Sequence, residues 1–183
     1  YDWSSIEKDA RAAGANAFLS KPIFESMLYN VLLSATGIDK TVRFQLSQME
    51  IKHPELEGRC ILLAEDNLLN QEIAVELLRM SGIEVECACN GKEAVDKFLM
   101  EPLKYDAILM DVQMPLMNGY QATELIRRAE CPRSATIPII AMTADAFHED
   151  MVKAAASGMN AHMAKPIDPE QLYHLLKEKI LKE

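Results

Sequence analysis

From residue 60 onward, hydrophobic and polar positions alternate along the chain in two different rhythms. Short apolar runs without polar alternation are typical of strands that are buried on both faces of a parallel sheet. Segments with apolar residues every three or four positions are typical of amphipathic helices. The runs predict strands over residues 60–64, 84–88, 105–110, 137–142 and 160–163. The periodic segments predict helices over residues 68–81, 91–100, 118–129, 146–156 and 169–181.

The order of these elements predicts the fold. Strand and helix alternate five times, which is the pattern of repeated strand–helix–strand units with right-handed crossovers. We therefore predict an α/β, flavodoxin-like, doubly wound fold with a five-stranded parallel sheet in the order 2-1-3-4-5 and five helices. In the first helix, Asn67 is placed to cap the start and Gly82 follows the end. Its core residues are predicted to be Ile73, Leu77 and Leu78.

The N-terminal part of the chain repeats the end of this domain. When residues 10–32 are laid on residues 154–176, 11 of the 23 positions are identical. Residues 1–36 therefore correspond to the last helix, strand and helix of the complete domain, without its first four strands. They predict an incomplete α-β-α segment, which is the C-terminal remnant of a preceding domain of the same kind.

Three segments follow from this comparison. Residues 1–36 are the remnant, residues 37–58 show no sustained period and predict a linker, and residues 59–183 form the complete domain. A parallel strand without neighbours leaves its backbone groups unpaired. We therefore expect residues 1–36 to dock on the complete domain or on a second copy of the chain, which would give a homodimer.

Composition narrows the function classes. The 183 residues are 49% hydrophobic and carry a formal net charge of −9. No cluster of Lys or Arg is long enough to follow a phosphate backbone, so we expect no nucleic-acid partner. No run reaches the roughly 18 apolar residues of a membrane span, so we expect no direct membrane contact. The four cysteines lack zinc-site spacing and read as reduced thiols, and the absence of an initiator Met suggests a piece of a longer protein.

Acidic residues follow two of the predicted buried strands. Asp111 ends the apolar run of residues 107–110, and Glu65 and Asp66 end the run of residues 60–64. The fourth strand ends with the hydroxyl of Thr143, and Lys165 follows the fifth. Ligands of open α/β sheets bind at the carboxyl ends of the strands, so these side chains are expected to meet at one edge.

This set of side chains suits phosphoryl chemistry with a metal. Clustered carboxylates favour a hard divalent cation, and Mg²⁺ takes one to three carboxylates while leaving positions for phosphate oxygens. An ammonium and a hydroxyl beside a carboxylate can stabilise a phosphoryl group in transfer. Asp111 would be the nucleophile that forms an aspartyl phosphate. For Asp111 alone, the plainer interpretation is a turn residue at a strand end.

The motifs around these residues resemble those of two-component receiver domains. The resemblance covers about residues 58–183 and rests, in order, on Glu65-Asp66-Asn67-x-x-Asn70, Met110-Asp111-x-x-Met114-Pro115-x-x-Asn118-Gly119, Thr143-Ala144 and Lys165-Pro166. It implies that Asp111 accepts phosphate from a phosphohistidine. It also implies that Mg²⁺ is bound by Glu65, Asp66, Asp111 and the backbone carbonyl of Gln113. Thr143 and Lys165 would contact the phosphoryl oxygens.

The resemblance also implies a switch that follows phosphorylation. The family's aromatic switch position, three residues before the lysine, is His162 in this sequence. Phosphorylation would bias a surface around the fourth helix and the fifth strand, which is a second candidate surface for a homodimer. Gln113, Met114 and Asp145 would tune dephosphorylation through sterics and water access.

The repeat makes the whole resemble the C-terminal end of a hybrid sensor histidine kinase. That implies a histidine kinase domain in the same parent chain as partner, together with a histidine phosphotransfer domain. It also implies a cytoplasmic location and a membrane-anchored parent, with kinase activity outside these residues. Two alternatives remain open: a phosphohydrolase with an aspartate nucleophile, and an interaction module that is not phosphorylated. Gln113 speaks against the first, because such enzymes usually have an acid two residues after the nucleophile.

Overall fold

A computed structural model describes residues 53–144 and 148–181. A single 3-10 turn, η1 (Pro54–Leu56), precedes the sheet. The strands are β1 (Cys60–Ala64), β2 (Glu84–Ala88), β3 (Ala107–Asp111), β4 (Ile139–Thr143) and β5 (Ala161–Ala164). The helices are α4 (Leu68–Met80), α5 (Gly91–Met100), α6 (Gly119–Arg128), α7 (His148–Ser157) and α8 (Pro169–Ile180). All neighbouring strands are parallel and the order is β2-β1-β3-β4-β5, which confirms the predicted fold.

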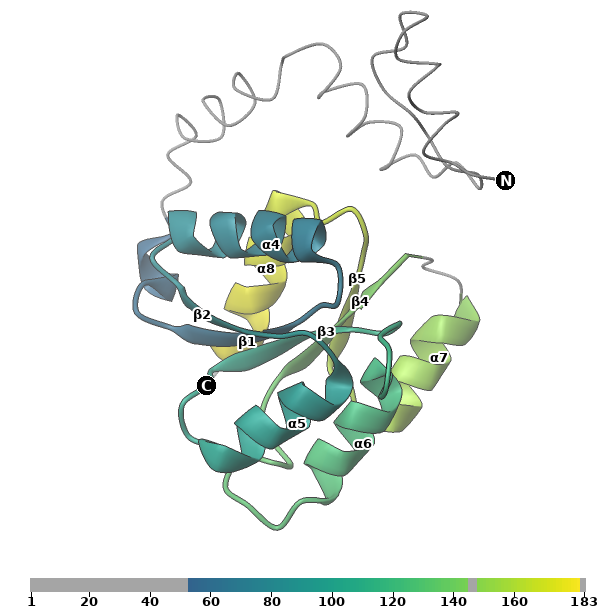
Figure 1. Ribbon diagram of the computed structural model, residues 1–183. Helices are drawn as coiled ribbons and strands as arrows, with labels where there is room; N and C mark the ends of the chain where they lie inside the picture. Colours follow the sequence, from purple (N-terminus) through teal and green to yellow (C-terminus); the bar gives the residue numbers. More distant parts are fainter. Residues whose placement is uncertain (1–52, 145–147, 182–183) are drawn as a thin grey trace, which may run out of the picture. The chain divides into compact units, whose positions relative to one another are not determined.

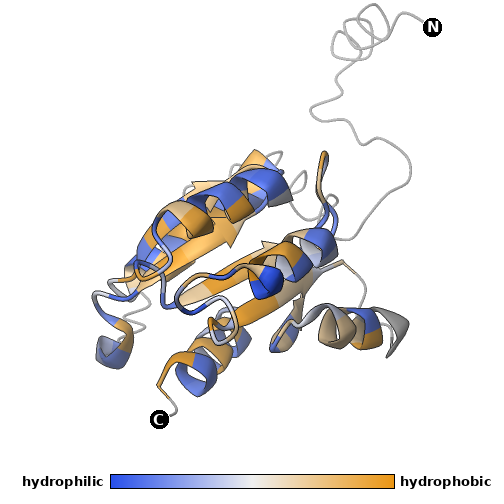
Figure 2. Ribbon diagram, turned by 90° about the horizontal axis from the view of Figure 1, so that it is seen from below, coloured by the Kyte–Doolittle hydropathy of each residue, from blue (hydrophilic) through white to orange (hydrophobic). Residues whose placement is uncertain are grey.

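The helices cover both faces of the sheet. Helices α4 and α8 lie on one face, and α5, α6 and α7 lie on the other (Figure 1). Successive residues of the central strands enter opposite cores, because side chains alternate along a strand. In β1, Leu62 packs toward α5 and α6, whereas Ile61 and Leu63 pack toward α4 and α8. The strands form an apolar layer between helices that carry hydrophilic residues as well (Figure 2), which explains why the sequence shows unbroken apolar runs.

The boundaries differ from the prediction where a side chain or a proline interrupts the ladder. Strand β3 begins at Ala107, two residues later than predicted, and just before it the carboxylate of Asp106 accepts the Cys60 amide at 2.8 Å. Strand β4 begins at Ile139, after a proline that has no amide hydrogen to donate. In α4 the caps are confirmed, since the Asn67 side chain accepts two backbone amides of the first turn. The core assignment of Ile73 is wrong: its side chain is 42% exposed, and Ala74 takes its place.

Residues 53–58, at the end of the predicted linker, pack on the domain. Leu56 is fully buried in the core beneath α4 and α8. The ring of His53 lies 4.4 Å from that of Tyr173, between ring centres, and Glu55 pairs with Lys177 at 2.5 Å. Both partners belong to α8. The chain therefore enters the domain along α8, four residues before the first strand begins.

The predictions for residues 1–36, and for the linker as far as residue 52, concern residues outside the described ones. The remnant, its docking and a homodimer through it stay predictions. All four cysteines are free thiols. Among the helices of residues 53–144 and 148–181, none is long and apolar enough to cross a membrane.

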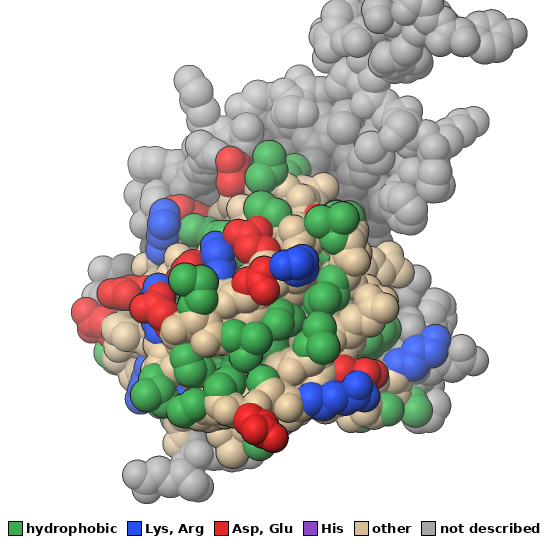
Figure 3. Space-filling view, turned by 60° about the horizontal axis from the view of Figure 1, so that its bottom comes forward, with side chains coloured by type: hydrophobic (Ala, Val, Ile, Leu, Met, Phe, Trp, Pro, Cys, Tyr) green, Lys and Arg blue, Asp and Glu red, His purple; other side chains and the backbone are tan. Residues whose placement is uncertain are grey.

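Apolar side chains are exposed on more than one part of the surface. Helix α5 exposes Leu99 and Met100, and α6 exposes Leu125. Helices α5 and α6 lie on the lower side of the molecule in Figure 1. Figure 3 brings this side toward the viewer, and hydrophobic side chains gather on it. Exposure of an apolar residue is therefore not by itself a sign of the functional site.

A single arginine ties α6 to the far ends of the sheet. The guanidinium of Arg127 donates to the carbonyls of Gly158, Ser134 and Ile137 and to the side-chain oxygen of Asn160, over distances of 2.7 to 2.9 Å. The Asn160 oxygen also accepts the Ile139 amide at 2.8 Å. These bonds supply donors to backbone carbonyls in two loops, outside the helices and strands.

We expect Arg127→Met to destabilise the domain by about 3 kcal/mol, because it removes a charged donor and leaves partly buried carbonyls unsatisfied. Arg128→Met is the matched control. Arg128 is the next residue on α6, is exposed, and has only an ion pair with Glu124, so its loss should cost less than about 0.5 kcal/mol. Urea unfolding gives both values. Equal midpoints for the two variants would contradict the structural role of Arg127.

Candidate functional site

The strand register brings the predicted residues to one edge of the sheet. Strands β1 and β3 pair so that Ala64 lies opposite Met110, which sets the residues after them, Glu65 and Asp111, side by side. Asp111 lies opposite Met142, and Thr143 lies opposite Ala164. Four adjacent strands, β1, β3, β4 and β5, thus end at the same edge of the sheet, and each places a polar side chain at this edge as the sequence predicts.

Lys165 connects two buried carboxylates at this edge. Its ammonium nitrogen lies 2.6 Å from Oε2 of Glu65 and 2.7 Å from Oδ2 of Asp111. Glu65 is 2% exposed and Asp111 is 4% exposed, so the two acids are almost removed from water. Like charges in such a place repel strongly and need a counter-charge between them. Lys165 supplies one positive charge for the two negative ones.

Asp66 completes a cluster of three acids. One oxygen each of Glu65, Asp66 and Asp111 lie within 4.8 Å of one another. Asp66 is exposed, and within residues 53–144 and 148–181 its carboxylate makes no hydrogen bond or ion pair. Three carboxylates and one ammonium leave two negative charges, which one divalent cation would balance. The donor set, carboxylate oxygens at the mouth of a pocket, suits a hard cation.

The loop after β3 shapes the site around Asp111. The backbone amide of Gln113 donates to Oδ1 of Asp111 at 3.1 Å. The amide of Gly119 donates to the carbonyl of Val112 at 3.0 Å, which closes the loop on the strand. A Cβ at Gly119 would overlap the carbonyl oxygen of Asp111. Glycine is therefore needed at this position for close backbone approach.

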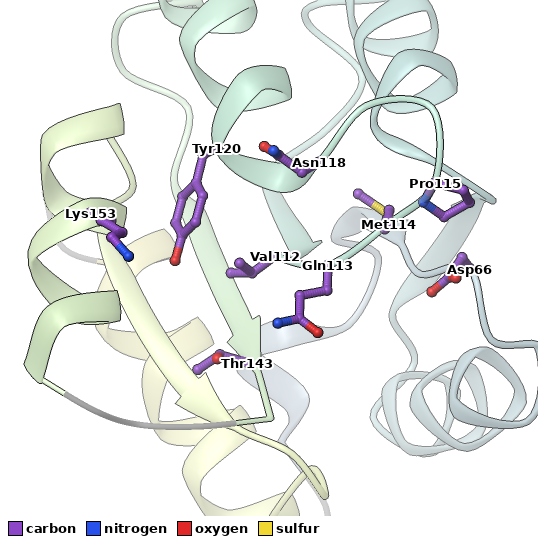
Figure 4. Close-up of a pocket in the computed structure, with 9 residues that line it drawn as sticks. All are labelled: Asp66, Val112, Gln113, Met114, Pro115, Asn118, Tyr120, Thr143 and Lys153. Atoms are coloured by element: carbon purple, nitrogen blue, oxygen red, sulfur yellow. The ribbon is translucent and has the colours of Figure 1, made fainter.

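A pocket of about 610 Å³ opens beside these residues. Figure 4 shows Gln113 and Thr143 projecting toward the same space, with the Tyr120 hydroxyl and the Lys153 ammonium near one another at its side. The lining residues are Asp66, Val112, Gln113, Met114, Pro115, Asn118, Tyr120, Thr143 and Lys153. Tyr120 and Lys153 are not among the site residues predicted from the sequence. Helical spacing does not suggest Tyr120, because residues two apart, such as Asn118 and Tyr120, do not share a helix face. Nothing in the sequence places Lys153 of α7 beside α6.

The structure describes the predicted switch residue, His162, but not Asp145, one of the predicted tuning residues. His162 is half-buried on β5, opposite Ala141. Its neighbour Met163 packs toward α4 and α8, so His162 faces the side of the sheet where α7 lies. Asp145 lies outside the described residues. The roles of His162, Gln113, Met114 and Asp145 stay predictions.

Together the fold and the site define a doubly wound α/β domain with a buried aspartate, a lysine and an acidic cluster at the switch point of the sheet. A family model, the response regulator receiver domain, matches residues 61–177. The chain therefore belongs to the receiver domain family of two-component phosphorelay signalling.

Known relatives agree with this assignment. The chain is 37% identical over 169 residues to hybrid signal transduction histidine kinase I of Dictyostelium discoideum, which covers 90% of this chain but only 9% of the relative. Among solved structures, the receiver domain of sensor histidine kinase PA1611 from Pseudomonas aeruginosa PAO1 is 39% identical, with a TM-score of 0.62. The match covers 68% of this chain and 99% of that one, and that structure has a magnesium ion coordinated in its active-site cleft.

A third match involves a complex. The receiver domain of Ssk1 from Saccharomyces cerevisiae, solved with the histidine phosphotransfer protein Ypd1, appears in a structure that matches with 29% identity and a TM-score of 0.61. That match covers 69% of this chain and 91% of the other.

Burial raises the pKa of the Asp111 carboxyl above the ordinary value of an aspartate, while the contact with Lys165 acts in the opposite direction. Above about pH 4 the unfolded chain releases this proton, whereas the folded protein keeps it until its higher pKa is passed. In metal-free buffer, the unfolding free energy of the wild type should therefore fall relative to Asp111→Asn as the pH rises through this window. Urea unfolding over a pH series measures the difference.

Glu86→Gln is the control of opposite sign. Hydrogen bonds from Lys104 and Tyr105 lower the pKa of Glu86, so its contribution is present above the unfolded pKa and is lost as the pH falls. The wild type should gain stability relative to Glu86→Gln as the pH rises. A pH-independent difference for Asp111→Asn would contradict the raised pKa.

Proposed function

We propose that Asp111 is the phosphoryl acceptor and that it takes the group from a phosphohistidine in a Mg²⁺-dependent reaction. The observation that carries this proposal is the position of Lys165, whose ammonium contacts Glu65 and Asp111 together at 2.6 and 2.7 Å. The lysine is thus already beside the carboxylate oxygen at which a phosphoryl group would be received. Membership of the receiver family supports the same assignment.

The reaction follows from the chemistry of these side chains. A carboxylate oxygen of Asp111 attacks the phosphorus of the phosphohistidine, the new O–P bond forms, and the P–N bond breaks with its electron pair returning to the imidazole. Lys165 and the hydroxyl of Thr143 stabilise the charge on the phosphoryl oxygens. The Gln113 amide fixes the orientation of Asp111 through its hydrogen bond to Oδ1.

The residues present fit a magnesium ion. Asp66, Asp111 and the backbone carbonyl of Gln113 would hold it, with Glu65 as the third acid of the cluster. When bound, the cation neutralises phosphoryl oxygens during the transfer. Its charge would also balance the two negative charges that Lys165 leaves uncompensated.

After transfer, the aspartyl phosphate would switch the surface around α7 and β5, with His162 at the switch position and Gln113, Met114 and Asp145 as tuning residues. A homodimer through this surface is part of the same proposal. The donor would be a histidine kinase domain of the parent chain, directly or through a histidine phosphotransfer domain. The domain would then work in the cytoplasm, where ATP charges the kinase, within a membrane-anchored hybrid kinase.

Acetyl phosphate and Mg²⁺ should label the chain with one phosphoryl group that hydroxylamine removes, as expected for an acyl phosphate. Asp111→Asn should abolish the label, because it removes the attacking oxygen, and EDTA should do the same by removing the metal. Intact-protein mass measures the adduct. Asp96→Asn, an exposed carboxylate on α5, should keep the label.

The same experiment separates the alternatives. Rapid multiple turnover of acetyl phosphate without accumulated label would favour the aspartate-nucleophile phosphohydrolase. A wild type that takes no label would favour the non-phosphorylated module, and a label that survives Asp111→Asn would exclude Asp111 as the acceptor.

Exposed apolar side chains beside the site support a protein as phosphoryl donor. We define the apolar rim as Leu68, Leu69, Ile73 and Leu116, all of them exposed. Leu69 and Ile73 are four residues apart and share a face of α4, which starts directly after the acidic pair. Leu116 is 88% exposed and has a φ of 66°, a conformation that is unfavourable for leucine. Apolar surface placed around an acidic pocket suits contact with a helical partner.

We expect Leu69→Glu to slow phosphotransfer from the ATP-charged histidine kinase domain of the parent by roughly tenfold, because it places a charge in the apolar contact. Labelling by acetyl phosphate, which needs no docking, should stay unchanged. Met100→Glu is the matched control, since Met100 is 81% exposed and is the last residue of α5, at the end of that helix away from the site. Equal effects of the two variants would contradict docking at the rim.

A further inference from the structure

The carboxylate of Glu65 is occupied at both oxygens by protein donors. Oε1 accepts the backbone amide of Asn67 at 3.2 Å and the side-chain amide of Asn70 at 3.2 Å. Oε2 contacts the ammonium of Lys165 at 2.6 Å. Each carboxylate oxygen has two lone pairs, so Oε1 has no acceptor site left. Glu65 therefore differs sharply from its neighbour Asp66, whose carboxylate faces the pocket mouth.

The first turn of α4 holds Asn70 in place. Oδ1 of Asn67 accepts the backbone amides of Leu69 and Asn70, at 3.0 and 3.2 Å. The side chain of Gln71 donates to the backbone carbonyl of Glu65 at 3.3 Å. The strand end and the helix start are thus bonded to each other at several points, so the amide of Asn70 reaches Glu65 from a fixed base.

We propose that Asn70 is a positioning residue for phosphoryl transfer. It holds Oε1 of Glu65 so that Oε2 keeps Lys165 against Asp111. Asn70 is not among the residues that line the pocket, and its side-chain amide donates to Glu65, so we infer that it acts through Glu65. This inference rests on the proposed function of Asp111. It assigns the two adjacent acids different tasks: Asp66 serves the metal, and Glu65 serves the lysine.

The length of the Glu65 side chain is part of the inference. A glutamate carboxylate has three rotatable bonds before it, and without a second anchor its position relative to Lys165 would vary. Aspartate is one methylene shorter and would not reach Asn70 from the same backbone position. The pairing of Glu65 with Asn70 is therefore specific to the longer acid.

A double-mutant cycle between positions 65 and 70 tests this inference, with the rate of labelling by acetyl phosphate and Mg²⁺ as one measurement and the Mg²⁺ dissociation constant from calorimetry as the other. Asn70→Ala should preserve the fold, because alanine is the better helix former. Glu72→Ala, an exposed glutamate on the same turn, is the control and should label at the wild-type rate.

We expect Asn70→Ala to lower the labelling rate roughly tenfold, the effect of losing a hydrogen bond to a charged group. In the Glu65→Asp background the same substitution should have no further effect, because the bond is already absent. The Mg²⁺ dissociation constant of Asn70→Ala should equal that of the wild type. These three results together would support the positioning role.

Other results overturn it. A decrease that persists in the Glu65→Asp background would show that Asn70 acts through α4, and an equal loss of Mg²⁺ affinity would show that it acts on the metal. A wild-type rate for Asn70→Ala would overturn the inference while leaving the proposed function intact. A wild type that takes no label would overturn the proposed function itself.

Discussion

The ion triad of Glu65, Lys165 and Asp111 is the interaction on which the rest of the site depends. Two carboxylates that are almost fully buried at the end of a sheet are stable together only with a positive charge between them. Lys165 supplies it from the fifth strand. Because β1, β3 and β5 each contribute one member, the triad requires the whole sheet to be assembled in register. The chemistry of the site therefore depends on the topology and register of the sheet.

That constraint explains how the domain divides its residues. The two apolar cores need only side chains of suitable volume that point alternately to the two faces of the sheet. The strands supply them from short runs of Ile, Leu, Ala and Met. The charged groups of the site lie at the carboxyl ends of the strands, and caps such as Asn67 and Asn118 satisfy backbone amides in the first turns of the helices. A change in strand length would move the acids relative to the lysine before it disturbed the cores.

Much of this could be predicted from the sequence. Short apolar runs that alternate with amphipathic helices favour buried parallel strands, and an acid directly after such a strand is expected at the ligand edge. The rotation of each helix against the sheet, and the contacts that depend on it, could not be predicted. Ile73 has the spacing of a core residue but lies on the outer face of α4, because helical period alone does not fix how a helix is rotated against the sheet. Lys153 and Arg127 depend in the same way on how α6 and α7 pack.

The docking of residues 53–58 has a mechanical consequence. Leu56 is anchored in the core, while Glu55 and His53 hold α8 from outside. Helix α8 begins four residues after Lys165, which bridges the two acids. Helix α8 therefore lies between the loop that holds Lys165 and the place where residues 53–56 pack on the domain. A force on residues 53–56 would therefore act on α8, whose first residue is four positions after the lysine that bridges the two acids.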